Sequence, residues 1–302
     1  MTGAATGVPT YAIPPTFLGT RRHDHAAQIC VAGIPLDLGT TNRSGARFGP
    51  GAIRHASRML VDGEHPQHWV DATKLPLADI GDFAIALGDL IASMARIEEE
   101  AHKIEHLVAL GGDHSITLPL LRALAKGQGP PALVHLDAHV DTWPDNFGQT
   151  YGHGSVFYHA IEEGLVEPHQ MVQIGIRSPV PREVHDWTAA RGVVTFTAQD
   201  VHEATPAAIA ARICEVVKDA PVYLSIDIDV LDPAFAPGTG TPEIGGLASW
   251  QLQAILRRLR GLRFVGMDLV EVAPAYDVAE ITALAGATMV WEYICLLGRA
   301  FR

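Results

Sequence analysis

The sequence predicts an α/β fold built around one mainly parallel β-sheet. Short apolar runs alternate with amphipathic stretches along the chain, as in repeated strand–helix units. The apolar runs are mostly continuous, whereas a half-exposed strand would alternate apolar and polar residues, so we expect strands buried on both faces. With 302 residues, of which 48% are hydrophobic and 19% charged, the chain can bury a large core in one globular domain.

In chain order, the first expected element is an arm. Residues 1–25 begin with a stretch rich in Thr, Pro and Gly, and we expect them to pack on the domain or on a neighbouring subunit. Residues 26–302 are expected to form a single domain. Seven apolar runs predict strands at residues 28–34, 107–111, 131–137, 170–176, 193–197, 221–227 and 263–270. Helical periodicity is clearest at residues 89–106, 116–126, 205–218 and 249–260.

The last segment, residues 279–298, is apolar on nearly all sides and contains Gly286. A helix of this kind is either a central packing helix or one that is buried at a subunit contact. The sequence pattern leaves both interpretations open.

Composition narrows the choice of partners and compartment. The formal net charge of −12 argues against nucleic acid or an anionic membrane and is compatible with a cationic substrate, although ordinary acidic solubility would also explain it. Cys30, Cys214 and Cys295 are widely spaced and predict free thiols in a reducing compartment. Neither a signal-peptide pattern nor an apolar run of about 18 residues is found, so we expect a cytoplasmic protein. No nucleotide-binding glycine motif occurs.

Carboxylate and imidazole side chains lie at the end of the third predicted strand, in the sequence Asp137-Ala138-His139-Val140-Asp141. In extended backbone the two aspartates and the histidine share one face. Burying them unpaired would cost several kcal/mol or more, and a divalent cation would remove that cost. Taken alone, the triplet is equally compatible with a strand end whose polar groups are satisfied by other means.

Three further polar clusters lie at or just beyond the ends of predicted strands. They contain His114 after a Gly-Gly-Asp turn, the pair Asp227 and Asp229, and the pair Asp268 and Glu271. Because ligands of parallel sheets bind beyond the carboxyl ends of the strands, we expect these clusters to meet. Four aspartates and two histidines would repel strongly there without cations.

Six ligands of mixed oxygen and imidazole type exceed a tetrahedral zinc site and suit two hard divalent cations. The expected ligands are His114, Asp137, His139, Asp141, Asp227 and Asp229. Manganese suits this set best, with nickel, cobalt and zinc as alternatives. Glu271 is left over, and its carboxylate would complement a guanidinium group beside the metals.

The chain resembles the ureohydrolases, a family that includes arginase, agmatinase, guanidinobutyrase and proclavaminate amidinohydrolase. The resemblance covers nearly the whole chain. It rests on RSGARFGPGAIR (43–54), GGDHSITLP (111–119), HLDAHVD (135–141), HGSVF (153–157), VQIGIR (172–177), SIDIDVLDPAFAPGTGTP (225–242) and VEVAPAYDVAEITAL (270–284). It implies a three-layer α/β/α sandwich around a mainly parallel sheet of about eight strands, one more than the apolar runs reveal.

The resemblance also implies two Mn²⁺ ions per chain. The first ion would bind His114, Asp137, Asp141 and Asp227, and the second Asp137, His139, Asp227 and Asp229. Asp137 and Asp227 would thus bridge the ions. Water activated by the ions would attack the guanidinium carbon, and collapse would give urea and an amine.

Two further residues match functional positions of the family. His153 matches a histidine that shuttles protons, although its own context is that of an ordinary loop histidine. Glu271 matches the carboxylate that orients the guanidinium.

Loops set the substrate within the family, and residues 142–151 lack the segment with which arginase holds the α-amino acid group. The C-terminal motifs look most like bacterial agmatinase, so we expect agmatine to be cleaved to putrescine and urea. Guanidinobutyrase, guanidinopropionase and proclavaminate-type activities are alternatives, as are an inactive metal-binding subunit and a dinuclear phosphoesterase. Trp143, Phe147 and Tyr158 are expected to be packing residues. A trimer or hexamer is expected, since the family forms such homo-oligomers.

Overall fold

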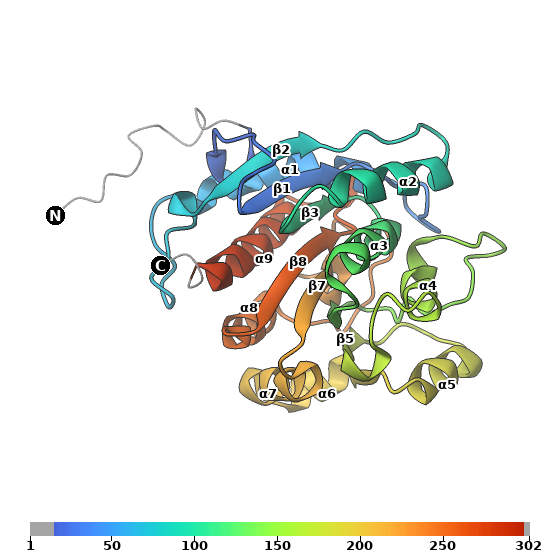
Figure 1. Ribbon diagram of the computed structural model, residues 1–302. Coiled ribbons are helices and arrows are strands. Elements are labelled where there is room, and N and C mark those ends of the chain that lie inside the picture. Colours follow the sequence, from blue (N-terminus) through green and yellow to red (C-terminus); the bar gives the residue numbers. More distant parts are fainter. Residues whose placement is uncertain (1–14, 299–302) are drawn as a thin grey trace.

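A computed structural model describes residues 15–298, and these form a single eight-stranded parallel sheet between two layers of helices (Figure 1). The strand order is β2-β1-β3-β8-β7-β4-β5-β6. The strands are β1 (Ile29–Ile34), β2 (Leu77–Asp82), β3 (Leu107–Gly111), β4 (Ala132–Leu136), β5 (Met171–Ile176), β6 (Val194–Thr197), β7 (Pro221–Asp227) and β8 (Arg263–Val270). The α/β/α architecture and the seven predicted strands are confirmed.

The strand missing from the prediction is β2, at one edge of the sheet. Its first three residues are buried and its last three are half-buried or exposed, and it carries Asp79 and Asp82. A strand of this composition lacks the continuous apolar run by which the buried strands were recognised. Asp79 is nevertheless buried, because the Arg54 guanidinium donates hydrogen bonds to both of its carboxylate oxygens at 2.8 and 3.0 Å.

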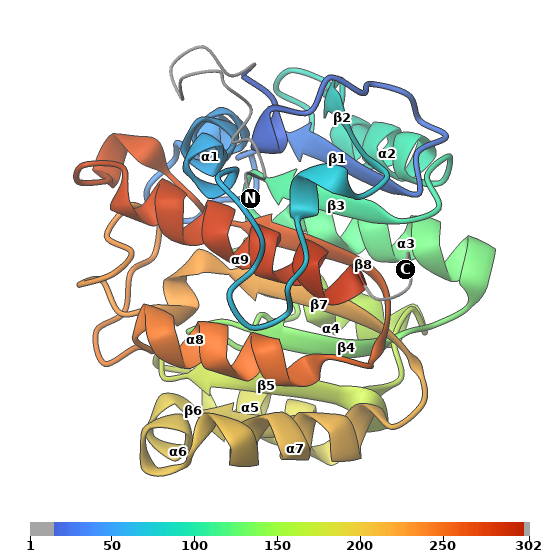
Figure 2. The same cartoon turned by 90° about the vertical axis from the view of Figure 1, so that its left-hand side faces the viewer.

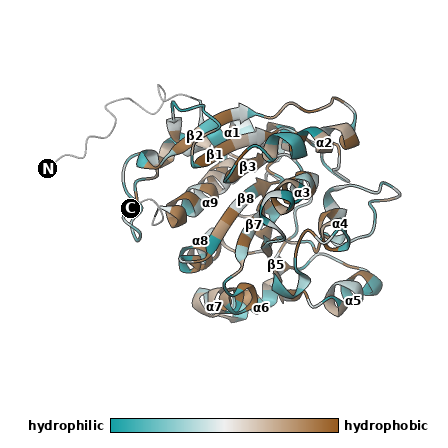
Figure 3. Ribbon diagram, in the orientation of Figure 1, coloured by the Kyte–Doolittle hydropathy of each residue, from teal (hydrophilic) through white to brown (hydrophobic). Residues whose placement is uncertain are grey.

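Nine α-helices lie among the described residues. They are α1 (Gly49–Ser57), α2 (Leu90–Ala101), α3 (Thr117–Gln128), α4 (Val156–Glu162), α5 (Arg182–Ala190), α6 (Ala198–Glu203), α7 (Pro206–Val217), α8 (Ser249–Leu256) and α9 (Ile281–Leu297). Figure 2 shows α1, α9, α8 and α7 in front of the sheet, with α3 and α4 behind it. Figure 3 shows hydrophobic residues along the central strands β7 and β8. Four helices were not predicted: α4 and α6 are too short for periodicity, α1 begins Gly-Pro-Gly, and α5 is mostly polar.

Helix α9 is a central packing helix, which decides between the two interpretations of the apolar segment. It packs on α1, α8 and β8, and most of its side chains are buried within the chain. Its one buried acid, Glu292, accepts hydrogen bonds from Arg257 at 2.9 Å and makes a 2.9 Å contact with Nε2 of His65. The charge inside this apolar helix is therefore paired.

Part of the predicted arm packs on the domain. Phe17 and Leu18 are buried, and their backbone N–H groups donate to Asp79 at 2.7 Å and to Ser57 at 2.8 Å. Residues 1–14 of the arm lie outside the described residues. No helix within residues 15–298 is long and apolar enough to cross a membrane.

The sheet order brings the predicted polar clusters together, because β3, β8, β7 and β4 are successive neighbours and all run parallel. Their carboxyl ends therefore meet at the middle of one edge. The turn after β3 is especially close-packed: a Cβ on Gly112 would lie 1.9 Å from the backbone oxygen of Leu36. Only glycine allows the chain to approach so closely there.

We therefore predict that Gly112→Ala lowers the free energy of unfolding by about 1–3 kcal/mol, because backbone atoms must move to admit the methyl group. Gly127→Ala is the matched control, since it lies in α3 with nothing within 4 Å of the added Cβ. The control should be neutral or slightly stabilising. Urea denaturation of both variants provides the measurement. Equal stability of the two variants would contradict the close approach.

Candidate metal centre and active-site cavity

The six predicted ligands lie on three short segments at the carboxyl ends of β3, β4 and β7. His114 opens a 3₁₀ turn whose N-cap, Asp113, accepts a hydrogen bond from the Ser115 N–H at 2.9 Å. The Asp227 carboxylate likewise accepts from the Asp229 N–H at 2.9 Å and begins a 3₁₀ turn after β7. Local hydrogen bonds of this kind bend the chain sharply at the strand end, so that the side chains converge.

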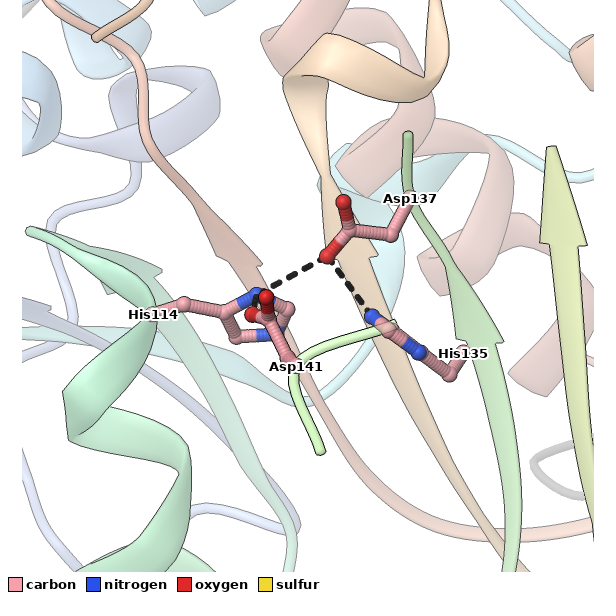
Figure 4. Close-up of side chains that lie close together, drawn as sticks. All are labelled: His114, His135, Asp137 and Asp141. Atoms are coloured by element: carbon pink, nitrogen blue, oxygen red, sulfur yellow. Dashed lines mark hydrogen bonds and ion pairs between the residues drawn. The ribbon is translucent and has the colours of Figure 1, made fainter. Parts of the chain in front are cut away.

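One group of contacts surrounds His114. Its Nδ1 lies 2.9 Å from Asp141 Oδ2 and 3.2 Å from Asp137 Oδ2 (Figure 4). The same atom lies 3.4 Å from Asp227 Oδ2. Nδ1 is buried and, among residues 15–298, has no hydrogen-bond partner of acceptable geometry. A buried nitrogen that faces three carboxylates without a hydrogen bond is the arrangement expected of a metal ligand.

A second group of contacts surrounds His139. Its Nδ1 lies 3.3 Å from Asp137 Oδ1 and 3.2 Å from Asp229 Oδ2. Asp137 thus turns one oxygen toward each histidine and belongs to both groups, as a bridging ligand would. Asp227 turns Oδ2 toward His114, and its Oδ1 accepts from the Asp229 backbone. The bridging position of Asp227 stays a prediction.

The four carboxylates of the cluster are buried close together, so nearby positive charge would stabilise their ionised forms. Burial together with the neighbouring Asp229 and Asp137 raises the pKa of Asp227 well above its ordinary value. Burial opposes protonation of His139, but Asp229 and Asp137 outweigh it and raise its pKa to about 12. Divalent cations would supply the same positive charge and leave the imidazoles as neutral ligands. Four carboxylates and two imidazoles are a donor set for two such ions.

His153 and Glu271 stand beside this cluster and contact each other. His153 Nδ1 lies 2.9 Å from Glu271 Oε1, which also accepts the His114 backbone N–H at 2.9 Å. The other ring nitrogen, Nε2, accepts the Thr41 N–H at 3.2 Å and lies 2.7 Å from Thr41 Oγ1. Glu271 Oε2 is buried and has no hydrogen-bond partner among residues 15–298. One carboxylate oxygen is therefore held by hydrogen bonds, and the other is not.

Opposing effects act on the proton of His153. Burial lowers its pKa, but the Glu271 carboxylate, with Asp141 and Asp113 beyond it, raises the pKa to about 9. The Thr41 N–H requires a lone pair on Nε2 and so favours the neutral ring. In that neutral ring the proton is on Nδ1 and is donated to Glu271.

Two residues of the site have left-handed backbone conformations. Asp141 has φ +49° and Glu271 has φ +66°, values that cost side chains other than glycine energy. Such strain, on the order of 1–3 kcal/mol for each residue, is typical of functional positions.

A cavity of about 710 Å³ adjoins the cluster of predicted ligands. Its lining includes His139, Asp141, Asp227 and His153. The remaining lining residues come from loops and are Thr41, Asn42, Arg43, Trp143, Asp145, Asn146, Phe147, Gly154, Ser178, Pro179, Pro181, Thr241, Pro242 and Glu243. Glu271 is not among the lining residues.

The structure corrects the interpretation of one aromatic residue, Phe147. It was expected to be a packing residue, but it is 96% exposed and lines the cavity. Trp143 packs as expected, against a small apolar cluster that includes Val184, and it lines the cavity as well. Both residues lie on the irregular loop after Asp141, where sequence periodicity carries no information. Tyr158 does pack, with its ring stacked on Trp187 at a centroid distance of 4.6 Å.

Other residues around the cluster were not singled out from the sequence. His135 Nε2 lies 2.7 Å from Asp137 Oδ2 (Figure 4). Its Nδ1 lies 3.3 Å from the Gln173 amide nitrogen, which can only donate. The proton of His135 is thus on Nε2 and is donated to Asp137, so His135 orients a carboxylate rather than offering a lone pair. Thr41 was missed because its contact with His153 spans 112 residues of sequence.

Comparison with known proteins agrees with this geometry. The arginase-family profile matches residues 27–295. An agmatinase from Photorhabdus laumondii is 46% identical over 276 residues, covering 89% of this chain and 87% of that protein. An agmatinase from Cronobacter sakazakii is 44% identical over 278 residues, covering 90% and 88% of the two chains.

Solved structures give the same result. A crystal structure described as a hypothetical agmatinase from Burkholderia thailandensis has a TM-score of 0.91 at 42% identity, covering 97% of this chain and 93% of that chain. Proclavaminate amidinohydrolase from Streptomyces clavuligerus also has a TM-score of 0.91, at 40% identity, covering 97% and 100%. With its motifs, its sheet and its carboxylate-rich strand ends in agreement with these matches, the chain belongs to the arginase family.

Proposed function

We propose that the protein is a dinuclear manganese hydrolase that cleaves the guanidinium group of agmatine to give putrescine and urea. The observation that carries the proposal is the cluster of four aspartates and two histidines under the cavity, next to the pair His153 and Glu271. Relatives named agmatinase at 44–46% identity support the choice of substrate.

The proposed ligands are the six residues predicted from the sequence, with Asp137 and Asp227 between the two ions. Two bound divalent cations would lower the pKa of water and so supply a nucleophile at neutral pH. The left-handed backbone at Asp141 and the turns at His114 and Asp227 hold the ligands in fixed positions. Fixed ligands keep the geometry of the site independent of the substrate.

The chain's own residues orient the substrate and move its protons. Glu271 Oε2 makes no hydrogen bond within the described part of the chain, so it can accept one from an N–H of the planar guanidinium of the substrate. This hydrogen bond would hold the guanidinium carbon beside the proposed metals. A guanidinium beside Glu271 would also oppose the rise in the pKa of His153 that this carboxylate causes. His153 would then give up its proton more readily, as transfer to a leaving amine requires.

The charged side chains that line the cavity would determine which charge is favoured on the end of the substrate opposite the guanidinium. Asp145 and Glu243 line the cavity and would favour the terminal ammonium group of agmatine. Arg43 also lines the cavity, with its guanidinium carbon 5.1 Å from the centre of the Tyr276 ring. This cation could pair with the carboxylate of a guanidino acid, so a guanidinobutyrase, guanidinopropionase or similar amidinohydrolase is the second candidate.

A panel of substrates tests the proposal. Manganese-loaded protein should release urea from agmatine with a higher kcat/KM than from 4-guanidinobutyrate, 3-guanidinopropionate, arginine or guanidine. A preference for a guanidino acid would replace agmatine by the second candidate. Release of phosphate from a generic phosphoester, without urea from any guanidino compound, would indicate the dinuclear phosphoesterase. Metal binding without any turnover would indicate an inactive metal-binding subunit.

We predict two equivalents of manganese per chain after reconstitution, measured by elemental analysis. Asp137→Ala should lose both ions, because Asp137 is shared by the His114 and His139 groups. Asp145→Asn is the control: it removes a cavity carboxylate that accepts a hydrogen bond from the Gly148 N–H and belongs to neither ligand group, so it should keep both ions. A single equivalent in fully active wild-type protein would refute the dinuclear site.

We also predict that Glu271→Gln retains two metals while kcat/KM for agmatine falls by about 10² or more. This loss is on the order of the 2–4 kcal/mol that removal of one buried charged partner costs. Metal analysis and steady-state kinetics on the same sample give both quantities. Loss of a metal together with activity would make Glu271 a ligand, and unchanged activity would mean that the guanidinium is held elsewhere.

Self-association into a trimer or hexamer completes the proposal. Because α9 is covered within the chain, the support comes instead from exposed apolar side chains at its N-terminal end. Val278 is 65% exposed and Ile281 is 41% exposed.

We place the protein in the cytoplasm, which agrees with its three free thiols, Cys30, Cys214 and Cys295.

Sedimentation velocity at micromolar concentration should accordingly detect an assembly of three or six chains, since burial of these apolar side chains favours association. Val278→Lys should shift the distribution toward smaller species. A wild-type sample containing only the 32.4-kDa monomer would contradict the proposed assembly.

A further inference from the structure

Asp268 is a buried carboxylate that neither binds the proposed metals nor lines the cavity. It lies on β8 directly opposite Ser225 on β7. The Ser225 hydroxyl donates to its Oδ1 at 2.7 Å, while Tyr223 and Thr117 donate to its Oδ2 at 2.8 and 2.9 Å. Both carboxylate oxygens are therefore occupied by hydroxyl donors.

These hydrogen bonds determine where the proton of His114 lies. A serine hydroxyl has one hydrogen, and Ser225 donates it to Asp268. Ser225 Oγ, which lies 2.8 Å from His114 Nε2, must therefore accept from that nitrogen. The proton of the neutral imidazole is thus on Nε2, and its lone pair is on Nδ1. Nδ1 is the atom that faces the aspartates without a hydrogen bond.

We propose that Asp268, acting through Ser225, is a positioning residue that holds His114 with Nδ1 free to bind a cation. This inference rests on the proposed metal site. Hydrogen bonds from outside a site commonly fix the tautomer and orientation of a histidine ligand and increase its basicity. Here a carboxylate performs this task through a serine, with every group fully buried.

Within residues 15–298, the second histidine, His139, has no comparable hydrogen bond behind it. His139 Nε2 lies 3.9 Å from Glu243 Oε1, beyond hydrogen-bond distance, and the His139 side chain is 17% exposed. Asp268 should therefore affect the ion bound by His114 and leave the ion bound by His139 nearly unchanged.

The chain offers matched variants for a test. Ser225→Ala breaks the link between Asp268 and His114, and Asp268→Asn removes the charge behind it. Thr117→Val and Tyr223→Phe each remove one hydrogen bond to the same carboxylate without touching the link. All four variants change the core, so any of them can disturb packing. Only Ser225→Ala and Asp268→Asn should also change the hydrogen bonding of His114.

The measurement is Mn²⁺ content and affinity by titration against a competing chelator. Ser225→Ala and Asp268→Asn should weaken one of the two ions about 10- to 100-fold and leave the other within about threefold. Thr117→Val and Tyr223→Phe should change both affinities by less than about threefold, even where the free energy of unfolding falls equally.

Two results would overturn the inference. One is wild-type affinity for both ions in Ser225→Ala, and the other is equal weakening in the control variants, which would make the effect a general consequence of core damage. Absence of urea release by wild-type protein that binds two ions would refute the proposed activity alone, because the affinities are measured without turnover. Failure of wild-type protein to bind Mn²⁺ would refute both.

Discussion

The repulsion among four buried aspartates at one sheet edge is the constraint on which the rest of the site depends. Two carboxylates about 4 Å apart repel by about 4 kcal/mol at an effective dielectric constant of 20. The fold cannot avoid this cost, because the four aspartates come from the carboxyl ends of β4 and β7, which are neighbouring parallel strands. Imidazoles, backbone N–H groups and divalent cations can offset this repulsion. The site already supplies the first two, because His114 contacts Asp137 and backbone N–H groups donate to Asp137 and Asp229. Divalent cations would offset the rest.

Around these aspartates, hydrogen bonds determine which ring nitrogen of each neighbouring histidine donates and which accepts. Asp268 and Ser225 leave Nδ1 of His114 free, whereas His135 gives its proton to Asp137. On the cavity side, Thr41 and Glu271 occupy the two nitrogens of His153. The consequence is a site whose donors and acceptors are set before a substrate enters, which reduces the reorganisation that the reaction requires.

The sequence predicted the parts of this arrangement that depend on local order. Continuous apolar runs locate buried strands, and polar residues just beyond them, such as Asp137 and Asp227, must meet at the carboxyl edge. The sequence did not predict the edge strand β2, because its acidic residues interrupt the apolar run. They fit into the strand only because Arg54, which is distant in the sequence, neutralises them. The contact of Thr41 with His153 was lost for the same reason, since hydrogen bonds between distant segments leave no periodic pattern in the sequence.

The division between strand ends and loops would allow the same metal ligands to serve several guanidino substrates. In the proposed function the strand ends would hold the guanidinium, while the tail would meet cavity-lining loop residues such as Asp145, Glu243 and Arg43, which can change without disturbing the ligands. Charge then selects the tail. In the proposed site, four carboxylates would balance two divalent ions, and Glu271 would add a further negative charge. A site with this excess would attract a dication such as agmatine more strongly than a zwitterionic guanidino acid, unless Arg43 turns toward the tail.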